Sequence, residues 1–252
     1  MLHDPSHYIP AVTAKEIVVS SQDRDILRRL AEQKAEIGHL PVQQETARLW
    51  TALNDLKSER PMVWINEICW NEMEHNGELT LQSEGQWARE QELNLRRELY
   101  QWSHLPGDMV VNPWMECPKA IHSTDFGIME DTDIAKTNED NDVVSRHFNV
   151  QIENIADLEQ IQMPVVTHNA AATAFRQQAF NDVFAHILPI RTVGQSHIWF
   201  TPWDFLIRWT GIENAMIGLY DDPDLFHAAV DRLVDAWMVE LDQFEEQKLL
   251  EL

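Results

Sequence analysis

The sequence predicts an α/β fold built from parallel βα units. Three short apolar runs, over residues 61–66, 108–114 and 188–193, have the length and composition of buried strands. Long segments with apolar residues at helical spacing alternate with these runs. Strands that alternate with long helices pair in parallel, because each helix supplies the crossover that a parallel pair needs. The hydrophobic fraction of 44% over 252 residues is enough to form a substantial core.

Two helices are expected before the first strand. After an irregular arm over residues 1–20, Ser21 or Asp23 is expected to cap a helix through DRDILRRLAEQKAEI, which stops at Gly38. Pro41 then opens a second helix, VQQETARLWTALNDL, because proline is tolerated in the first helical turn.

The first predicted strand is PMVWIN, residues 61–66. A helix over residues 84–104 follows, with Trp87, Leu95 and other apolar residues at helical spacing. After a turn at Pro106–Gly107, the apolar run DMVVNPW predicts the second strand, over residues 108–114.

Residues 118–162 interrupt the alternation of strands and helices. Within them, GIMEDTDIAKTNEDNDVVSRHFNVQI has two alternating stretches around the turn-prone TNEDN, which predicts an inserted β-hairpin. A helix over residues 170–187 then leads into the third strand, LPIRTV, residues 188–193. The aromatic segment WFTPWDFLIRW, a helix IENAMIGLY and a long helix opened by Pro223 complete the chain.

Charge and composition exclude several classes of function. The net charge is −23, from 42 acidic and 19 basic residues, so the chain repels phosphate backbones and anionic lipid, and we expect neither nucleic acid nor membrane as a partner. No apolar run approaches the ~18 residues of a membrane span. The opening MLHDPSHYIP lacks the pattern of a secretion signal, and two cysteines make no disulfide framework. We therefore expect a cytoplasmic protein.

Chemistry in parallel sheets gathers at the carboxyl ends of strands. Glu67 and Glu116 follow neighbouring predicted strands, so they are the candidates for acid–base catalysis, against the alternative that both are solvated surface charges. The candidate substrate-binding residues are aromatic or polar side chains near the same ends, although core packing would also explain the tryptophans. They are Asn66, Trp70, Asn112, Trp114, Trp203 and Asp204.

No metal site is predicted. Cys69 and Cys117 are candidates to bind a soft metal with His75 or His122, but a buried and inert cysteine is the commoner case. The remaining acids and histidines considered near predicted strand ends are expected to be surface or structural groups: Glu72, Glu74, Glu78, His168 and His197.

Several blocks together resemble the uroporphyrinogen decarboxylase-like superfamily. They are RPMVWIN after two helices, DMVVNPW, and ILPIRTVGQSHIWFTPWDFLIRWTGIENAMIGLYDDPDLFHAAVDRLVDAWMVELDQFEEQ with its DP-x-L segment. The resemblance is nearest to a Trp-rich branch with a WNE segment and a hairpin insertion. It implies a (β/α)8 TIM barrel of which this chain resembles the N-terminal part, with a helical arm over 1–60 and barrel elements over 61–252. About three strands cannot close a barrel, so we expect self-association or a completing subunit.

The resemblance implies a corrinoid-linked methyltransferase acting on a small methylated substrate. A complete enzyme of this family carries zinc, and a separate corrinoid protein carries the methyl group. The segment NEICWNEME lacks the arginines of true decarboxylases, and Asn112 stands near their aspartate, which disfavours a porphyrinogen substrate. The methyltransferases' His-x-Cys zinc pair is also absent, so we expect no cofactor within this chain. The alternative is a non-catalytic half-barrel or partner subunit.

Overall fold

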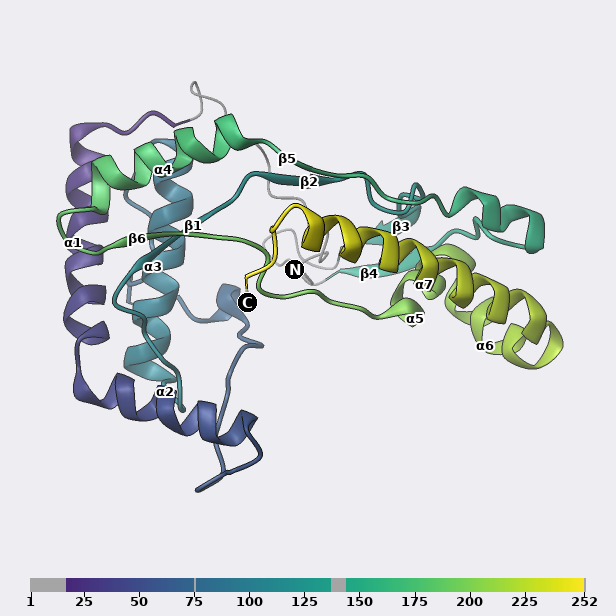
Figure 1. Cartoon of the computed structure of the whole chain (residues 1–252), viewed down its shortest axis with the longest axis horizontal. Helices are drawn as coiled ribbons and strands as arrows, with labels where there is room; N and C mark the ends of the chain where they lie inside the picture. Colours follow the sequence, from purple (N-terminus) through teal and green to yellow (C-terminus); the bar gives the residue numbers. More distant parts are fainter. Residues whose placement is uncertain (1–16, 75, 137–143, 252) are drawn as a thin grey trace. The chain divides into compact units, whose positions relative to one another are not determined.

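In the computed structural model, the described part of the chain passes three times between two compact units (Figure 1). The structure describes residues 17–74, 76–136 and 144–251, so His75, the TNEDN turn and most of the predicted N-terminal arm lie outside the described residues. We call residues 17–118 with 170–193 unit 2, and residues 119–169 with 194–251 unit 1. Each unit has its own hydrophobic core and is described by itself.

Three predicted helices open unit 2 and are confirmed. They are α1 (Ser21–Gly38), α2 (Pro41–Asn54) and α3 (Gln86–His104). Gly38 is required for close approach rather than for a left-handed backbone: a Cβ there would lie 3.0 Å from the backbone of Pro113. A larger residue would push these two segments apart.

The core of unit 2 joins α1, α3 and α4 (Ala170–Phe184). Leu27 and Phe184 are fully buried, and Trp87 meets Phe180 edge-to-face with ring centroids 5.4 Å apart. Aromatic pairs in this geometry add to the stabilisation that buried apolar area provides.

The predicted strand over residues 61–66 is wrong. The segment pairs with no strand among the described residues, and Trp64, expected in the interior, is 61% exposed. Its backbone is instead held by Asp108, whose carboxylate accepts from the Val63 N–H at 2.7 Å and whose own N–H donates to the Val63 carbonyl at 2.9 Å. These bonds replace a strand ladder, so the apolar run alone did not identify the structure.

The predicted strand over residues 108–114 is displaced toward the C-terminus. The observed strand β1 spans Met115–Pro118 and pairs in parallel with β6 (Ile190–Val193), which lies inside the third predicted strand. Pro113 has no N–H to donate to a ladder, and the Val111 N–H is bonded to the side chain of Gln43 in α2. Sheet pairing therefore begins only after the proline.

Unit 1 contains two antiparallel pairs. Strand β2 (Ile121–Ser123) pairs with β5 (Val166–His168), and β3 (Thr132–Ala135) pairs with β4 (Ser145–Phe148). The second pair matches the hairpin that the alternating stretches predict. A 3-10 helix, η2 (Ile155–Gln160), follows β4.

Three helices carry the core of unit 1. They are α5 (Pro202–Thr210), α6 (Ile212–Asp221) and α7 (Pro223–Glu246). The sequence predicts α6 and α7 as helices, and α5 forms within the aromatic segment that precedes them. Gly211 lies between α5 and α6 and caps both helices. Its φ of 76° is a backbone conformation that favours glycine. The core of the unit gathers around α5 and α7, with Leu206 and Leu233 fully buried.

The fold is mixed α/β, as predicted, but its strands are few and short. The described residues form three two-stranded sheets and no closed barrel, so the TIM barrel is not part of the observed architecture. None of the described helices is both long and apolar enough to cross a membrane.

Candidate functional site

The structure brings two of the predicted site residues into contact. The Trp114 indole N–H donates to the Glu116 carboxylate at 3.2 Å. Trp114 precedes β1 and Glu116 is its second residue, so neither follows a strand as the strand-end argument required. The contact comes from alternation instead, because residues two apart along an extended segment share a face.

A third residue completes this group. Arg191 in β6 stands directly opposite Glu116 in the parallel pair, and its guanidinium lies 3.4 Å from the centroid of the Trp114 ring. We call Trp114, Glu116 and Arg191 the cation cluster. The Trp114 ring holds the Arg191 guanidinium by cation–π attraction, and Glu116, which makes no ion pair with Arg191 among the described contacts, adds a negative charge to the same group. The sequence did not point to Arg191 as a site residue, although Arg191 lies in the predicted strand over residues 188–193, which pairs with β1.

The other predicted residues of unit 2 have different neighbours. Trp70 begins the 3-10 helix η1 (Trp70–Glu72) and packs on α3, with its ring 6.1 Å from that of Tyr100 and 5.1 Å from the guanidinium carbon of Arg97. Asn66 and Glu67 are exposed, and Asn112 is half-buried beside the close approach of Gly38. Glu67 makes no hydrogen bond or ion pair with another described residue, so the structure does not join it to Glu116.

Trp203 and Asp204 belong to α5 of unit 1. Trp203 packs against the core of that unit, with its ring 6.1 Å from that of Phe226 in α7. Asp204 is exposed in the first turn of α5, where a carboxylate complements the positive end of the helix. Structural roles account for the positions of both.

The two cysteines differ sharply in environment. Cys69 is exposed, whereas Cys117 in β1 is completely buried. Burial raises the pKa of the Cys117 thiol to about 11, opposed in part by the charge of Arg176. Across the part of the chain that the structure describes, no group of three histidine, cysteine or carboxylate side chains is placed to hold a metal ion, and His75 lies outside that part.

A polar cleft of about 250 Å³ lies in unit 2 beside α1 and α3. Sequence reasoning missed this cleft, because it is built from surface charges that look ordinary when taken singly. Its lining residues are Arg29, Leu30, Gln33, Glu78, Gln82, Arg96, Leu99, Tyr100 and Ser103.

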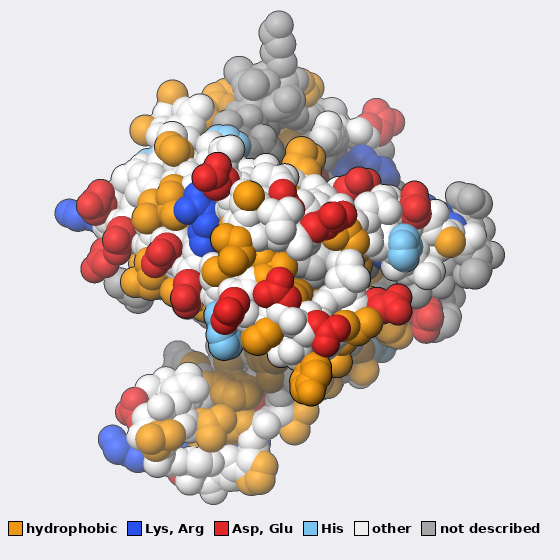
Figure 2. Space-filling view, turned by 90° about the vertical axis from the view of Figure 1, so that its right-hand side faces the viewer, with side chains coloured by type: hydrophobic (Ala, Val, Ile, Leu, Met, Phe, Trp, Pro, Cys, Tyr) orange, Lys and Arg blue, Asp and Glu red, His pale blue; other side chains and the backbone are white. Residues whose placement is uncertain are grey.

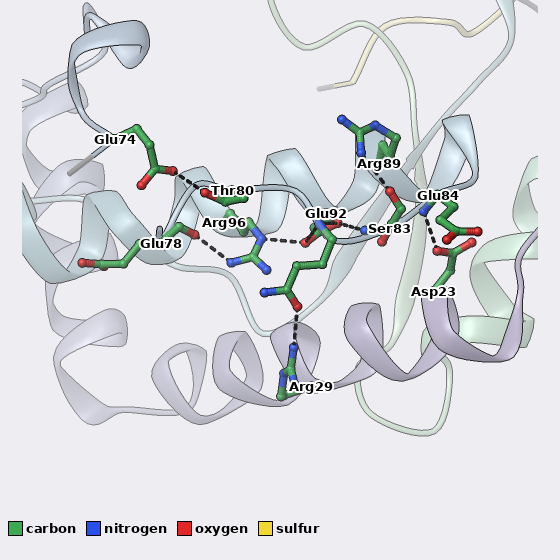
Figure 3. Close-up of polar contacts among 11 residues, drawn as sticks. Asp23, Arg29, Glu74, Glu78, Thr80, Ser83, Glu84, Arg89, Glu92 and Arg96 are labelled. Atoms are coloured by element: carbon green, nitrogen blue, oxygen red, sulfur yellow. Dashed lines mark hydrogen bonds and ion pairs between the residues drawn. The ribbon is translucent and has the colours of Figure 1, made fainter. Parts of the chain in front are cut away.

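The cleft is shaped by Glu92, a fully buried carboxylate on α3 (Figure 3). It accepts from the backbone N–H groups of Gln82 at 3.0 Å and Ser83 at 2.8 Å, and from the Arg96 guanidinium at 2.7 Å. Burial raises the pKa of Glu92, but these hydrogen bonds outweigh burial and hold that pKa below its ordinary value. The carboxylate therefore stays ionised and fastens the segment over 78–83 to α3.

Glu78, at the other end of this segment, is held twice. Its backbone carbonyl accepts from Arg96 at 2.7 Å, and its carboxylate lies 2.9 Å from the His104 ring nitrogen. The Tyr100 ring in turn lies 4.3 Å from the ring of His104. Arg29 donates to the side chain of Gln82 at 3.3 Å across the cleft. Arg29, Glu78 and Arg96, the charged side chains that line the cleft, thus each have a polar partner within the chain.

Comparisons with protein-family profiles, curated proteins and solved structures return no match for this chain.

Proposed function

We propose that the chain recognises a small methylated cation at the cation cluster, as the substrate-binding part of a corrinoid-linked methyl-transfer system. The observation that carries this proposal is the position of Arg191 over Trp114, beside Glu116. A quaternary or protonated amine has the same charge as the guanidinium and is attracted by the same aromatic face and carboxylate. The ligand displaces Arg191, an exposed side chain, from the ring.

The uroporphyrinogen decarboxylase-like barrel belongs to this proposal. The sequence blocks that resemble that superfamily support it, as does the parallel pairing of β1 with β6, in which helix α4 directly precedes the second strand. Such barrels place a helix before each parallel strand. Here the connection from β1 to α4 also contains residues 119–169 of unit 1.

The zinc that the family implies does not fit the residues of this chain. The sequence has no His-x-Cys pair, and the described residues offer no group of three suitable donors. We therefore derive no step through zinc or through a corrinoid. The role of these residues is to bind and orient a cation, with an acidic molecule of net charge −23 attracting it.

Titration with tetramethylammonium chloride, against sodium chloride of equal ionic strength, tests the proposal by calorimetry. We expect Trp114→Ala and Glu116→Gln each to weaken binding about tenfold, because each removes one of the two attractions. Arg191→Ala should strengthen binding, because it removes the internal competitor. Trp64→Ala is the matched control, since Trp64 is an exposed tryptophan of the same unit outside the cluster. Unchanged affinity in both Trp114→Ala and Arg191→Ala would refute the proposal.

A further inference from the structure

On helix α6, small residues face the interior and several large apolar residues face solvent, the reverse of the usual distribution. Its inner face carries small residues: Ala215 is fully buried, and a Cβ on Gly218 would lie 2.1 Å from the ring of Phe226 in α7. Its large apolar residues lie outside. Ile212, Met216, Leu219 and Tyr220 are 58%, 61%, 51% and 90% exposed, at the i, i+4, i+7, i+8 spacing of a face that is normally buried. We call these four residues the α6 face.

A hollow of about 310 Å³ borders α6. Phe226, Leu225 and Ile152 give it apolar walls, and Glu153 and Asp222 place carboxylates on its lining. The α6 residues that line this hollow are Asn214, Ile217 and Gly218, which lie on the side of the helix away from the α6 face, so the hollow is a separate feature. The four large apolar side chains of the α6 face are themselves exposed apolar surface of the kind that marks an interaction site.

The charge around α6 has a single sign. Between Arg208 and Arg232 the sequence holds five acidic residues and no lysine or arginine. Of these, Glu213, Asp221, Asp222 and Asp224 are exposed. Figure 2 is viewed from the side on which α6 lies in Figure 1, and it shows orange hydrophobic side chains exposed between red acidic ones. An acidic rim around an apolar face complements a partner with basic residues beside apolar anchors.

We propose that the α6 face docks a basic amphipathic helix of a partner protein. The spacing of the exposed residues suits helix-against-helix contact, and Met216 supplies an adaptable surface of the kind used to bind such helices. A second copy of this chain is disfavoured as occupant, because a symmetric contact would bring two acidic rims together. An anionic membrane surface is repelled by the same charge. This surface belongs to unit 1, so the proposal stands or falls independently of the cation cluster in unit 2.

The test uses the full chain and a synthetic Leu/Lys amphipathic helix of about 18 residues as the probe. The comparison peptide is a scrambled sequence of the same composition, which keeps the charge and loses the apolar stripe. We expect the double variant Met216→Ser/Tyr220→Ser to bind the probe at least tenfold more weakly than the parent chain, measured by fluorescence anisotropy. The matched control, Met129→Ser/Met238→Ser, removes two other exposed methionines of unit 1 and should bind as the parent does.

Circular dichroism of both variants checks that they fold. Equal binding by the two double variants, or equal binding of the probe and the scrambled peptide, overturns the proposal, because either result reduces the interaction to charge alone. Sedimentation of the parent chain tests whether a second copy of the chain or a membrane occupies the α6 face instead. A dimer that Met216→Ser/Tyr220→Ser converts to monomer would assign the face to a second copy, and co-sedimentation with phosphatidylcholine vesicles would assign it to a membrane; each also overturns the proposal.

Discussion

Glu92 illustrates, at the scale of a residue, how unit 2 keeps a charge in its interior. A buried carboxylate is costly unless hydrogen bonds replace the water it loses. Here the backbone of Gln82 and Ser83 and the guanidinium of Arg96 supply them, and the carboxylate in return satisfies N–H groups of a segment without regular structure. The residue thus organises the cleft without being a candidate for catalysis.

Glu92→Gln should destabilise the folded chain by about 3 kcal/mol, the usual cost of removing one member of a buried charged pair. The amide retains the shape of the side chain but leaves the Arg96 charge without its partner. Urea denaturation followed by circular dichroism measures the change. Glu90→Gln, an exposed glutamate on the same helix, is the control and should change the free energy of unfolding by less than about 0.5 kcal/mol. Equal effects of the two variants would contradict this account.

The same carboxylate gives stability a defined pH dependence. Because the pKa of Glu92 is lower in the folded chain than its ordinary value of 4.5, its contribution is present above that value and is lost as pH falls through the folded pKa. Glu92→Gln removes this contribution. The acid limb of a stability–pH curve should therefore be shallower for Glu92→Gln than for Glu90→Gln, and parallel limbs would exclude Glu92 as a source of the dependence.

The thiols make a second residue-scale prediction. Cys117 is buried and its raised pKa of about 11 keeps it protonated, whereas Cys69 is exposed. Since the thiolate is the reactive form, a disulfide reagent near neutral pH should modify one thiol in the folded chain and both after denaturation. Cys69→Ser should abolish the reaction of the folded chain. Rapid modification of both thiols without denaturant would show that β1 opens or that Cys117 is not enclosed.

At the scale of elements, the helices of this chain were more predictable than its strands. Pro41 and Pro223 begin α2 and α7, as their tolerance in a first turn predicts. Short apolar runs are ambiguous because strand formation depends on a partner elsewhere in the chain. Residues 61–66 lack such a partner, and Pro113 delays the start of β1. The predicted site depended on those strand ends, which explains why the structure brings only Trp114 and Glu116 together.

The cap of helix α1 is Ser20, one residue before Ser21, the earlier of the two predicted caps Ser21 and Asp23. The Ser20 hydroxyl accepts from the Asp23 N–H at 3.0 Å, and the Asp23 carboxylate also accepts from the N–H of Glu84 at 2.8 Å, just before α3. Asp23 therefore connects the starts of two helices (Figure 3). Hydrogen bonds to Glu84, Ser20 and Gly85 outweigh the effect of burial and hold the pKa of Asp23 below its ordinary value.

Ser20→Ala should cost about 1 kcal/mol of stability, because it removes the side chain that caps α1. Ser21→Ala is the matched control: Ser21 is the first residue of the helix, is exposed, and has no capping bond among the described contacts. Its substitution should change stability by less than about 0.5 kcal/mol, measured by urea denaturation. A larger effect of Ser21→Ala than of Ser20→Ala would mean that Ser21 caps α1, as the sequence predicts.

At the scale of the whole molecule, the main feature is the excess of negative charge. The 42 acidic residues exceed the 19 basic ones by 23, and the ion pairs that the structure describes engage only a minority of the carboxylates. Like charges spread over one folded chain repel one another and oppose compaction. In the two proposed interactions, the same excess would attract cations to the cation cluster and basic segments to the α6 face. Binding and stability therefore respond to salt in opposite directions.

Raising the sodium chloride concentration from about 20 to about 300 mM near pH 8 should increase the melting temperature, because salt screens the net repulsion. A gain of about 1 kcal/mol corresponds to about 3 °C for a chain of this size. The control is the same titration near the sequence isoelectric point of 4.7, where repulsion no longer exceeds attraction and the increase should vanish or reverse. A melting temperature that falls with salt near pH 8 would mean that the described ion pairs, such as Arg60–Asp108, outweigh the excess of 23 negative charges. In that case the acidic surface would have to be regarded as internally neutralised, and its attraction for cations and basic helices would lose its physical basis.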